Sequence, residues 1–343
     1  MLPENTNQWL GAYLYYNEPW EQFLVEAIAP YVKTVLQTGI AQQYFFVRYW
    51  DRGPHIRLRF KAEKHVIDQL LKPNLEEHFL NYFEDKPSAR TDPKYPSDFP
   101  IAYQWLPNNS VQYIDYQPEL ERYAGAHGTQ IAESQFHSSS NLVLKELQRY
   151  GSQWSYDDAL GTAIKMHLSF VQALEMGLEE ARVFFYFVFH NWLPRSMPYF
   201  QRKRSHQEYQ QQVAETIRAF EQSFEQQKAT LVPFHQALWE ALEEGAEFEE
   251  AAMNEWIEEN KAIGQALWQA MDQGQLKERP TDYQFQASTT LLLPRKDLSK
   301  ATQQIWMLYA DFIHMSNNRL GIQNRDEGYL AFLIAQSLEH LMK

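Results

Sequence analysis

A titratable or cationic side chain stands at every second position of one short stretch, namely at His55, Arg57 and Arg59. The residues between them are apolar, and this period of two is typical of a half-buried strand. On strand geometry the three side chains share one face, with about 6–7 Å between successive members. The row is either a solvated basic face or an anion-binding row inside a cleft, and the pattern alone allows both. Arginine suits the second role, because a guanidinium pairs with a carboxylate through two hydrogen bonds.

This row is expected on the second strand of a β-hairpin over residues 44–60. The turn falls at Asp51-Arg52-Gly53-Pro54, between two alternating halves. Asp51 can bond its own backbone there, and Gly53 can take the positive φ that a tight turn requires. The alternation also predicts that both arginines face a cleft, while the apolar residues between them lie in the core.

A second candidate is His314, on an amphipathic helix expected over residues 297–317. Asp311 precedes it by three residues and Asn318 follows by four, so both can share its face of the helix. Asp311 could orient the ring, as carboxylates do for catalytic histidines. The alternative is a partly buried helix histidine that makes an ordinary hydrogen bond.

A third candidate is Arg122, which follows an expected strand and precedes a turn containing Gly125 and Gly128. An arginine at a strand end beside a glycine turn is well placed to reach a cleft. A surface ion pair with Glu119 or Glu121 explains the same residue equally well.

The elements that must position these residues follow the order β-α-β-β-α-β in the first 140 residues. This order predicts the α+β class, with an antiparallel or mixed sheet backed by helices. Pro30 and Pro73 are expected to kink or break the two helices. A Pro-rich loop precedes the last strand, and a loop so long is either mobile or functional. The expected ranges are strands 8–17, 44–60 (the hairpin) and 111–116, helices 20–36 and 64–83, and the loop 84–110.

Residues 141–343 show helical periodicity almost throughout, so a mostly helical part carrying His314 is expected to pack against residues 1–140 as one functional unit. Ser138-Ser139-Ser140 can cap the first of these helices. The long Gln- and Glu-rich helices are typical of solvated bundle helices or of a surface for a partner. The expected ranges are 141–150, 156–176, 179–192, 205–227, 234–244, 247–272, 297–317 and 327–342.

Composition excludes several classes of function. The 343 residues carry a net charge of −13, which argues against general nucleic-acid binding through phosphates. Cysteine is absent, so disulfides and thiolate chemistry are excluded. Nucleotide-binding motifs are missing and the histidines lack ligand spacing, so neither a cofactor nor a metal is expected. With no apolar run long enough to span a bilayer and no secretory signal, we expect a cytoplasmic protein without membrane contact.

Four segments, in order, resemble motifs of the lantibiotic dehydratase C-terminal family, also described as thiopeptide-type bacteriocin biosynthesis proteins. The first reads Phe-Phe-Val-Arg-Tyr-Trp-Asp-Arg-Gly-Pro-His-Ile-Arg-Leu-Arg-Phe. The second is similar to the family's Tyr-x-Pro-Glu-x-Glu-Arg-Tyr-Gly-Gly, the third to its Phe-His-x-Asp-Ser, and the fourth to its Leu-His-Met…Asn-Arg-Leu. The matched segments are residues 45–60, 116–125, 136–140 and 312–320.

The resemblance implies glutamate elimination. In such proteins a partner esterifies Ser or Thr of a precursor peptide with glutamate, and this domain removes the glutamate to leave dehydroalanine or dehydrobutyrine. The family's elimination residues fall on Arg57, Arg59, Arg122 and His314. Arginines would bind carboxylate and stabilise developing charge, and a histidine would move a proton. We expect five further residues to bind substrate: His55, Arg48, Tyr123, Asn318 and Arg319.

The family also contains cyclases that join two dehydroalanines into the pyridine ring of thiopeptides and remove the leader peptide. Because all four elimination residues are retained, elimination is favoured over this alternative. A non-catalytic module that binds leader peptide by β-augmentation is a further alternative. Expected partners are the precursor peptide and a separate glutamylating protein, since no segment before residue 8 could hold that part, and a homodimer is allowed.

Three features depart from the family pattern. Ala124 replaces the first glycine of the usual pair, and Ser138-Ser139-Ser140 lacks the usual aspartate. The loop over residues 84–110 makes the gap between the hairpin and Arg122 longer than expected. This loop is a candidate for covering the cleft and altering the substrate.

Overall fold

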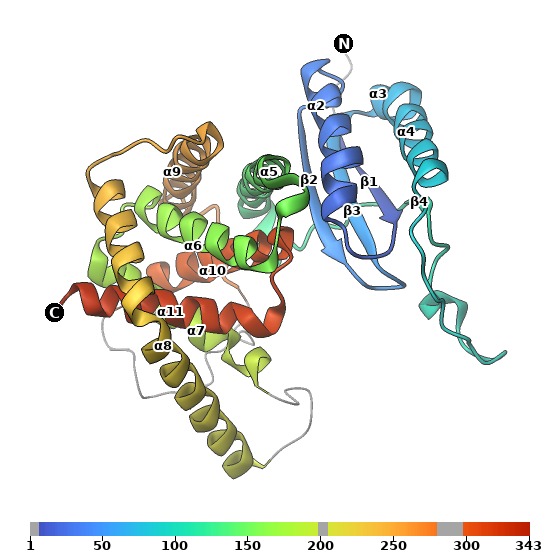
Figure 1. Ribbon diagram of the computed structural model, residues 1–343. Helices are drawn as coiled ribbons and strands as arrows, with labels where there is room; N and C mark the ends of the chain where they lie inside the picture. Colours follow the sequence, from blue (N-terminus) through green and yellow to red (C-terminus); the bar gives the residue numbers. More distant parts are fainter. Residues whose placement is uncertain (1–6, 198–204, 280–297) are drawn as a thin grey trace. The chain divides into compact units, whose positions relative to one another are not determined.

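The computed structural model describes residues 7–197, 205–279 and 298–343 (Figure 1). These residues form two compact units. The first consists of Met1–Pro118 and Phe136–Trp154, and the second of Glu119–Gln135 and Ser155–Lys343. Helix α5 (Gly125–Tyr150) contributes to both. The predicted α+β class is confirmed, since a small sheet is followed by a long helical part.

The sheet of the first unit has the order β2-β3-β1-β4, and every pair of neighbours is antiparallel. The predicted hairpin is confirmed as β2 and β3, which pair from Gln43 with Lys61 to Tyr49 with His55. The order β-α-β-β-α-β is confirmed as well. The strands are β1 (Asn7–Tyr15), β2 (Gln43–Tyr49), β3 (His55–Glu63) and β4 (Ser110–Tyr113).

Both helices of the first unit pass their prolines without breaking. Pro30 and Pro73 each lie at the start of an α-helical segment that follows one turn of π-helix. The wider π turn shifts the hydrogen-bond pattern, so the proline ring avoids the carbonyl that it would meet in an α-helix. The successive segments are α1 (Glu21–Phe23), η1 (Leu24–Ile28) and α2 (Ala29–Gln37), then α3 (Lys64–Val66), η2 (Ile67–Leu71) and α4 (Lys72–Asp85).

These helices cover one face of the sheet. The alternate residues Ile56, Leu58 and Phe60 of β3 are fully buried on this face, as predicted. Tyr31 of α2 packs against Phe60, with ring centroids 5.8 Å apart. Burial of the apolar set fixes the register of the strand, and therefore sends the polar set to the other face.

The outer edge of β2 is closed by side chains of α5. His137 Nδ1 lies 2.9 Å from the carbonyl oxygen of Tyr44, and Phe46 N–H donates to Ser140 Oγ at 3.2 Å. The predicted cap at Ser138-Ser139-Ser140 is therefore wrong, because α5 begins at Gly125 and these serines lie inside it. The hydroxyls of Ser139 and Ser140 donate to the Phe136 carbonyl within the helix, and that of Ser140 also accepts from the sheet. An added peptide strand on this edge would have to displace them, which argues against β-augmentation at β2.

The Pro-rich segment is a loop, as predicted, with one 3₁₀ turn, η3 (Ile101–Tyr103). It is tied to the β2–β3 turn, since Leu106 N–H donates to the Arg52 carbonyl at 2.9 Å and Arg52 Nε donates to the Gln104 carbonyl at 3.1 Å. Arg90 Nη2 adds a bond of 2.6 Å to the Leu106 carbonyl. Within its own unit the loop is therefore an ordered cover of the hairpin turn.

The second unit is helical, with α7 and α11 packed along each other and α8 beside α11 (Figure 1). Two predicted helices, 205–227 and 234–244, are one continuous helix that contains Pro233. The helix carrying His314 begins at Lys300, and Asp297 of the predicted range lies outside the described residues. The helices after α5 are α6 (Tyr156–Ala173), α7 (Leu178–Ser196), α8 (His206–Glu243), α9 (Ala251–Asp272), α10 (Lys300–Leu320) and α11 (Asn324–Leu341), and η4 (Gly151–Gln153) is a 3₁₀ turn of the first unit.

Candidate functional site

The two arginines of β3 are held between aromatic rings on one face of the sheet. The Arg57 guanidinium lies 3.4 Å from the centroid of the Tyr49 ring and 4.7 Å from that of Tyr13. The Arg59 guanidinium lies 4.5 Å from the ring of Tyr116, and its residue is 9% exposed. Stacking of this kind restricts the guanidinium and leaves its edge for hydrogen bonds. The face is therefore built of aromatic walls around cations, which a merely solvated strand face does not require.

His55 belongs to the same face, but it is not a cation at neutral pH. Burial lowers the pKa of His55 to about 4, which outweighs the opposing hydrogen bond with the Gly53 carbonyl. Nδ1 of the ring lies 2.8 Å from that carbonyl, and Arg57 Nε donates to Nε2 at 3.2 Å. His55 therefore acts as a neutral acceptor that orients Arg57.

Arg48 lies on the opposite, helix-covered face of the sheet, because it pairs in register with Ile56. Its Nη1 forms an ion pair of 2.6 Å with Glu21, and the Arg48 side chain is 4% exposed. The partner explains the lowered pKa of Glu21, where burial acts in the raising direction and Arg48 outweighs it. This placement favours a structural role for Arg48 over the substrate-binding role that the sequence suggested.

In the second unit a single carboxylate joins two arginines. Arg122 donates to Asp311 Oδ1 from Nε at 3.2 Å and from Nη2 at 2.9 Å, and Arg279 Nη2 lies 2.9 Å from Oδ2. Arg122 Nη1 also meets Glu119 at 3.2 Å, so one of the two ion pairs considered as the alternative for this residue is present. Burial lowers the pKa of Arg122, but the Asp311 charge outweighs this and raises it above its usual range. This cluster already holds a carboxylate in the way an arginine pair holds an anion.

His314 lies near this cluster, and its ring is oriented by Glu327, from the first turn of α11. Nδ1 lies 3.0 Å from Oε1 and 3.1 Å from Oε2 of that carboxylate. The Trp192 ring stacks on the imidazole, with centroids 4.3 Å apart. The prediction that Asp311 orients the ring is wrong, because Asp311 is engaged by Arg122 and Arg279.

The cavity that these groups share measures about 270 Å³. All of its lining residues belong to the second unit. They include three arginines, one aspartate and one histidine. A volume of this size suits an amino-acid-sized group better than a folded partner. Its lining residues are Arg122, Asn191, Trp192, Arg195, Arg279, Met307, Ala310, Asp311, His314 and Asn324.

The remaining predicted binding residues lie close by in the same unit. Tyr123 is buried, its ring stacks on Phe312 with centroids 6.5 Å apart, and burial raises its pKa above the usual range. Arg319 is fully buried and donates from Nη1 to the Met315 carbonyl at 2.7 Å. The Asn318 carbonyl accepts from Gly321 N–H at 3.1 Å at the end of α10. These contacts support the helix end and the turn that carry the site.

Sequence reasoning missed Arg279, Glu327 and Trp192. Arg279 follows α9 and gave no motif or periodic signal. Glu327 had one available signal, since a carboxylate in the first turn of a helix next to a histidine-bearing helix is a natural partner for it. Arg57 and Arg59 belong to the first unit and Arg122 and His314 to the second, so the convergence of all four on one ligand stays a prediction.

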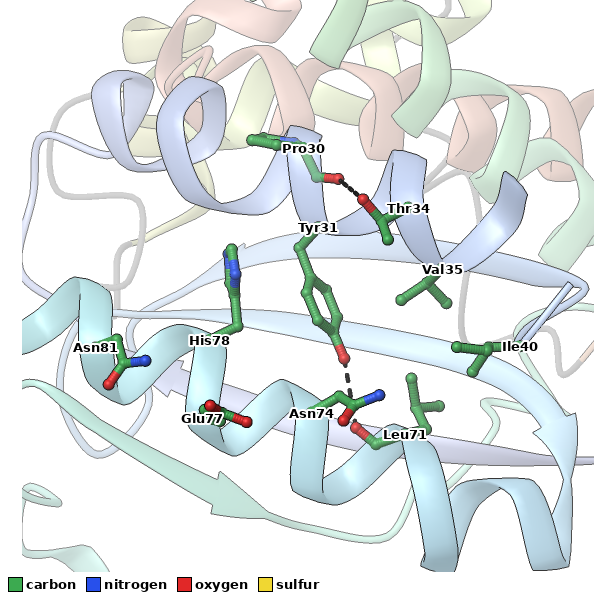
Figure 2. Close-up of a pocket in the computed structure, with 10 residues that line it drawn as sticks. All are labelled: Pro30, Tyr31, Thr34, Val35, Ile40, Leu71, Asn74, Glu77, His78 and Asn81. Atoms are coloured by element: carbon green, nitrogen blue, oxygen red, sulfur yellow. Dashed lines mark hydrogen bonds between the residues drawn. The ribbon is translucent and has the colours of Figure 1, made fainter. Parts of the chain in front are cut away.

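A further hollow lies in the first unit, between α2 and α4 (Figure 2). It measures about 430 Å³, and Figure 2 shows the Tyr31 hydroxyl directed at the Leu71 carbonyl, 3.3 Å away. Its rim carries Asn74, Glu77 and Asn81. None of the predicted site residues lines it, so it is set apart from the chemistry described above.

Among the residues that the structure describes, no group of three or more histidine, aspartate or glutamate side chains is placed to hold a metal ion. Within the same ranges, no helix combines the length and the apolar character that crossing a bilayer requires.

Comparison with known proteins matches the chain to a family of lantibiotic biosynthesis. Residues 9–338 match the family described as lantibiotic biosynthesis dehydratase, C-terminal. The subtilin biosynthesis protein SpaB of Bacillus subtilis is 26% identical over 167 residues, which are 49% of this chain and 14% of SpaB. The matched region thus spans a small part of that relative's length.

Three solved structures have similar folds. The pyridine synthase TbtD from thiomuracin biosynthesis aligns over 97% of this chain and 98% of its own, with a TM-score of 0.73 and 15% identity. TsrL aligns over 98% and 95%, with a TM-score of 0.65 and 17% identity. The tRNA-dependent lantibiotic dehydratase MibB from Microbispora sp. 107891 aligns over 98% of this chain and 28% of its own, with a TM-score of 0.57 and 15% identity.

Proposed function

Because the chain belongs to the lantibiotic biosynthesis dehydratase C-terminal family, we propose that it eliminates glutamate from glutamylated Ser or Thr of a precursor peptide. The products are dehydroalanine or dehydrobutyrine and free glutamate. In this reaction a base takes the Cα proton, the Cα–H electron pair forms the Cα=Cβ bond, and the Cβ–O bond breaks. The glutamate leaves as a carboxylate.

The observation that supports this proposal most is the shared cavity of Arg122 and His314. A histidine whose ring is oriented by a carboxylate is suited to take a proton from a substrate. An arginine beside it can bind carboxylate and stabilise the charge that grows on the departing glutamate carboxylate. Both parts of a β-elimination are therefore available within one unit of the chain.

Arg57 and Arg59 are the proposed second cationic element of the site. Their aromatic walls hold the guanidinium groups before any ligand arrives, which lowers the entropic cost of binding an anion. His55 adds a neutral acceptor behind Arg57 at 3.2 Å. We assign these arginines to the glutamyl group and to the enolate oxygen of the substrate.

Incubation of the protein with a synthetic glutamyl-Ser peptide tests the proposal. We expect loss of one glutamate by mass spectrometry and a product that adds a thiol, as dehydroalanine does. The His314→Ala variant should bind the peptide but release no glutamate. A folded protein that leaves a cognate glutamylated peptide unchanged would exclude the lyase.

One observation favours a second candidate, a cyclase that forms a pyridine ring from two dehydroalanines with loss of the leader peptide. TbtD, described as a pyridine synthase, shares the fold over 97% of this chain. A peptide with two dehydroalanines and no glutamyl ester separates the two activities. Ring formation with leader release would assign the cyclase, and an unchanged peptide would leave elimination as the activity to be measured.

For both activities the precursor peptide is the proposed partner, and a separate glutamylating protein is the proposed partner for elimination. Variants of Arg57 and His314 also distinguish an enzyme from a non-catalytic binding module. A binding module would keep its effect on the pathway in these variants. An enzyme would lose turnover in these variants but would still bind the peptide.

A further inference from the structure

The His314 ring is held by a carboxylate that comes from the next helix. Both oxygens of Glu327 lie near Nδ1, at 3.0 and 3.1 Å. The Glu327 side chain is 1% exposed and that of His314 is 16% exposed. A carboxylate taken so far from water requires partners, since an unpaired buried charge is costly. The imidazole is one of these partners, so the contact is part of the fold and not a chance approach of two surface groups.

The contact defines the tautomer of the ring. A carboxylate only accepts hydrogen bonds, so the proton of the neutral imidazole must reside on Nδ1. Nε2 then carries the lone pair. Within the described ranges no protein group is hydrogen-bonded to Nε2, and the residue lines the cavity that also contains Arg122. The basic nitrogen of His314 is thus kept available for a ligand.

We propose that Glu327 is the positioning residue of the elimination reaction, an assignment that rests on the proposed function. It holds His314 as the Nδ1–H tautomer, and Nε2 takes the Cα proton of the glutamylated residue. The charged ring that results is stabilised by the Glu327 carboxylate. The Cα–H electron pair becomes the new double bond, glutamate departs, and the proton passes from Nε2 to solvent.

Two further contacts make the arrangement rigid. Asn317 donates from Nδ2 to Oε2 of Glu327 at 3.2 Å, so the carboxylate is fixed from α10 as well as by its own helix. Trp192 stacks on the ring at 4.3 Å and at an angle of 28°, which restricts rotation of the imidazole. The ring is therefore oriented by one charge and one flat surface, as general bases are in sites built for proton transfer.

The test combines a direct reading of the tautomer with turnover. In ¹⁵N-histidine-labelled protein, two-bond ¹H–¹⁵N correlations distinguish the Nδ1–H from the Nε2–H tautomer, and His314→Gln identifies the signals of His314. We expect the Nδ1–H tautomer in the wild type. Glu327→Gln should lose it, because an amide can also donate to Nδ1, and kcat for glutamate release should fall by about 10²-fold or more with little change in KM.

Asp326→Asn is the matched control. Asp326 neighbours Glu327 in the same helical turn, but its carboxylate accepts a hydrogen bond from the Tyr156 hydroxyl at 2.6 Å instead of holding the histidine. We expect this variant to keep both the tautomer and kcat. A wild-type His314 in the Nε2–H tautomer would overturn the proposal even if Glu327→Gln fails to fold. So would a folded Glu327→Gln protein with unchanged tautomer and kcat.

The two readouts separate this inference from the proposed function. If the tautomer depends on Glu327 as expected, Glu327 is shown to hold the His314 ring even where no glutamate is released. Absence of glutamate release from a cognate peptide would instead count against the lyase.

Discussion

Arg122 donates two hydrogen bonds to the same oxygen of Asp311, although 189 positions separate the two residues in the chain. The other oxygen of Asp311 meets Arg279 at 2.9 Å. One carboxylate therefore serves as counter-charge to two guanidinium groups, in a place where the Arg279 side chain is only 2% exposed. The pair links the turn before α5 to the helix that carries His314.

Removal of the Asp311 charge should destabilise the protein strongly. Asp311→Asn removes the counter-charge that the buried Arg279 shares with the partly exposed Arg122, at a cost of about 3 kcal/mol in the free energy of unfolding. Glu119→Gln is the control, since Glu119 pairs with the same arginine but its side chain is 60% exposed. It should cost less than about 1 kcal/mol. Urea unfolding of both variants measures the contrast, and equal losses would contradict it.

The anion-binding role of β3 should be confined to its two arginines. Arg59→Lys keeps the charge but loses the planar fork that stacks on Tyr116, so glutamate release should fall by at least about 10-fold. Lys61 lies on the same face, with its amine 5.6 Å from the Trp9 ring. Lys61→Gln should change the rate less than about threefold. Steady-state kinetics with a glutamylated peptide decides, and similar losses in both variants would favour a diffuse charge effect.

The edge of β2 should depend on the α5 serine that closes it. Ser140→Ala leaves the buried N–H of Phe46 without the acceptor that lies 3.2 Å away, which costs about 1–3 kcal/mol of stability. Ser134 lies on the same helix, and its hydroxyl donates to the Gln130 carbonyl of that helix. Ser134→Ala should stay within about 0.5 kcal/mol of the wild type. Thermal unfolding distinguishes the two; a neutral Ser140→Ala would mean that the bond is unimportant.

Alanine at position 124, where the family motif has glycine, should destabilise the fold, and a return to glycine should remove this cost. Ala124 has a φ of 57°, in the left-handed region that disfavours a Cβ atom. Ala124→Gly should therefore raise the free energy of unfolding by about 0.5–1 kcal/mol. Ala219→Gly, at an exposed position in the interior of α8, should lower it by about 1 kcal/mol. Denaturant midpoints test the opposite signs.

His55 should make the protein less stable towards acid. Its pKa is 6.5 in the reference state and about 4 in the fold, so between these values the unfolded chain binds a proton that the native chain does not. Stability from His55 is complete above about pH 6.5 and is lost as the pH falls towards 4, on the order of 3 kcal/mol in total. His55→Gln should flatten this part of the profile. Denaturant unfolding at several pH values between about 4 and 7 measures this slope in the wild type and in the variant.

The local pattern was enough to predict much of the first unit. Alternation in His55–Phe60 predicted the strand and the separation of its two faces, because a strand with one buried face admits a single register. Four ordered segments indicated the family, and with it Arg122 and His314. Periodicity predicted most helices of the second half, but not where they end. Residues that often end a helix lie inside one here, namely the three serines within α5 and Pro233 within α8.

The partners of the site residues were decided by tertiary structure alone. Asp311 was the nearest carboxylate to His314 along the helix, yet Glu327 holds the ring, because α11 returns beside α10 and brings its first turn to Nδ1. Arg279 had no local pattern at all. Burial also made the titratable His55 a neutral acceptor. By itself the sequence determined which side chains could do chemistry, while packing determined which charges each of them meets, since hydrogen bonds and desolvation act through space and not along the chain.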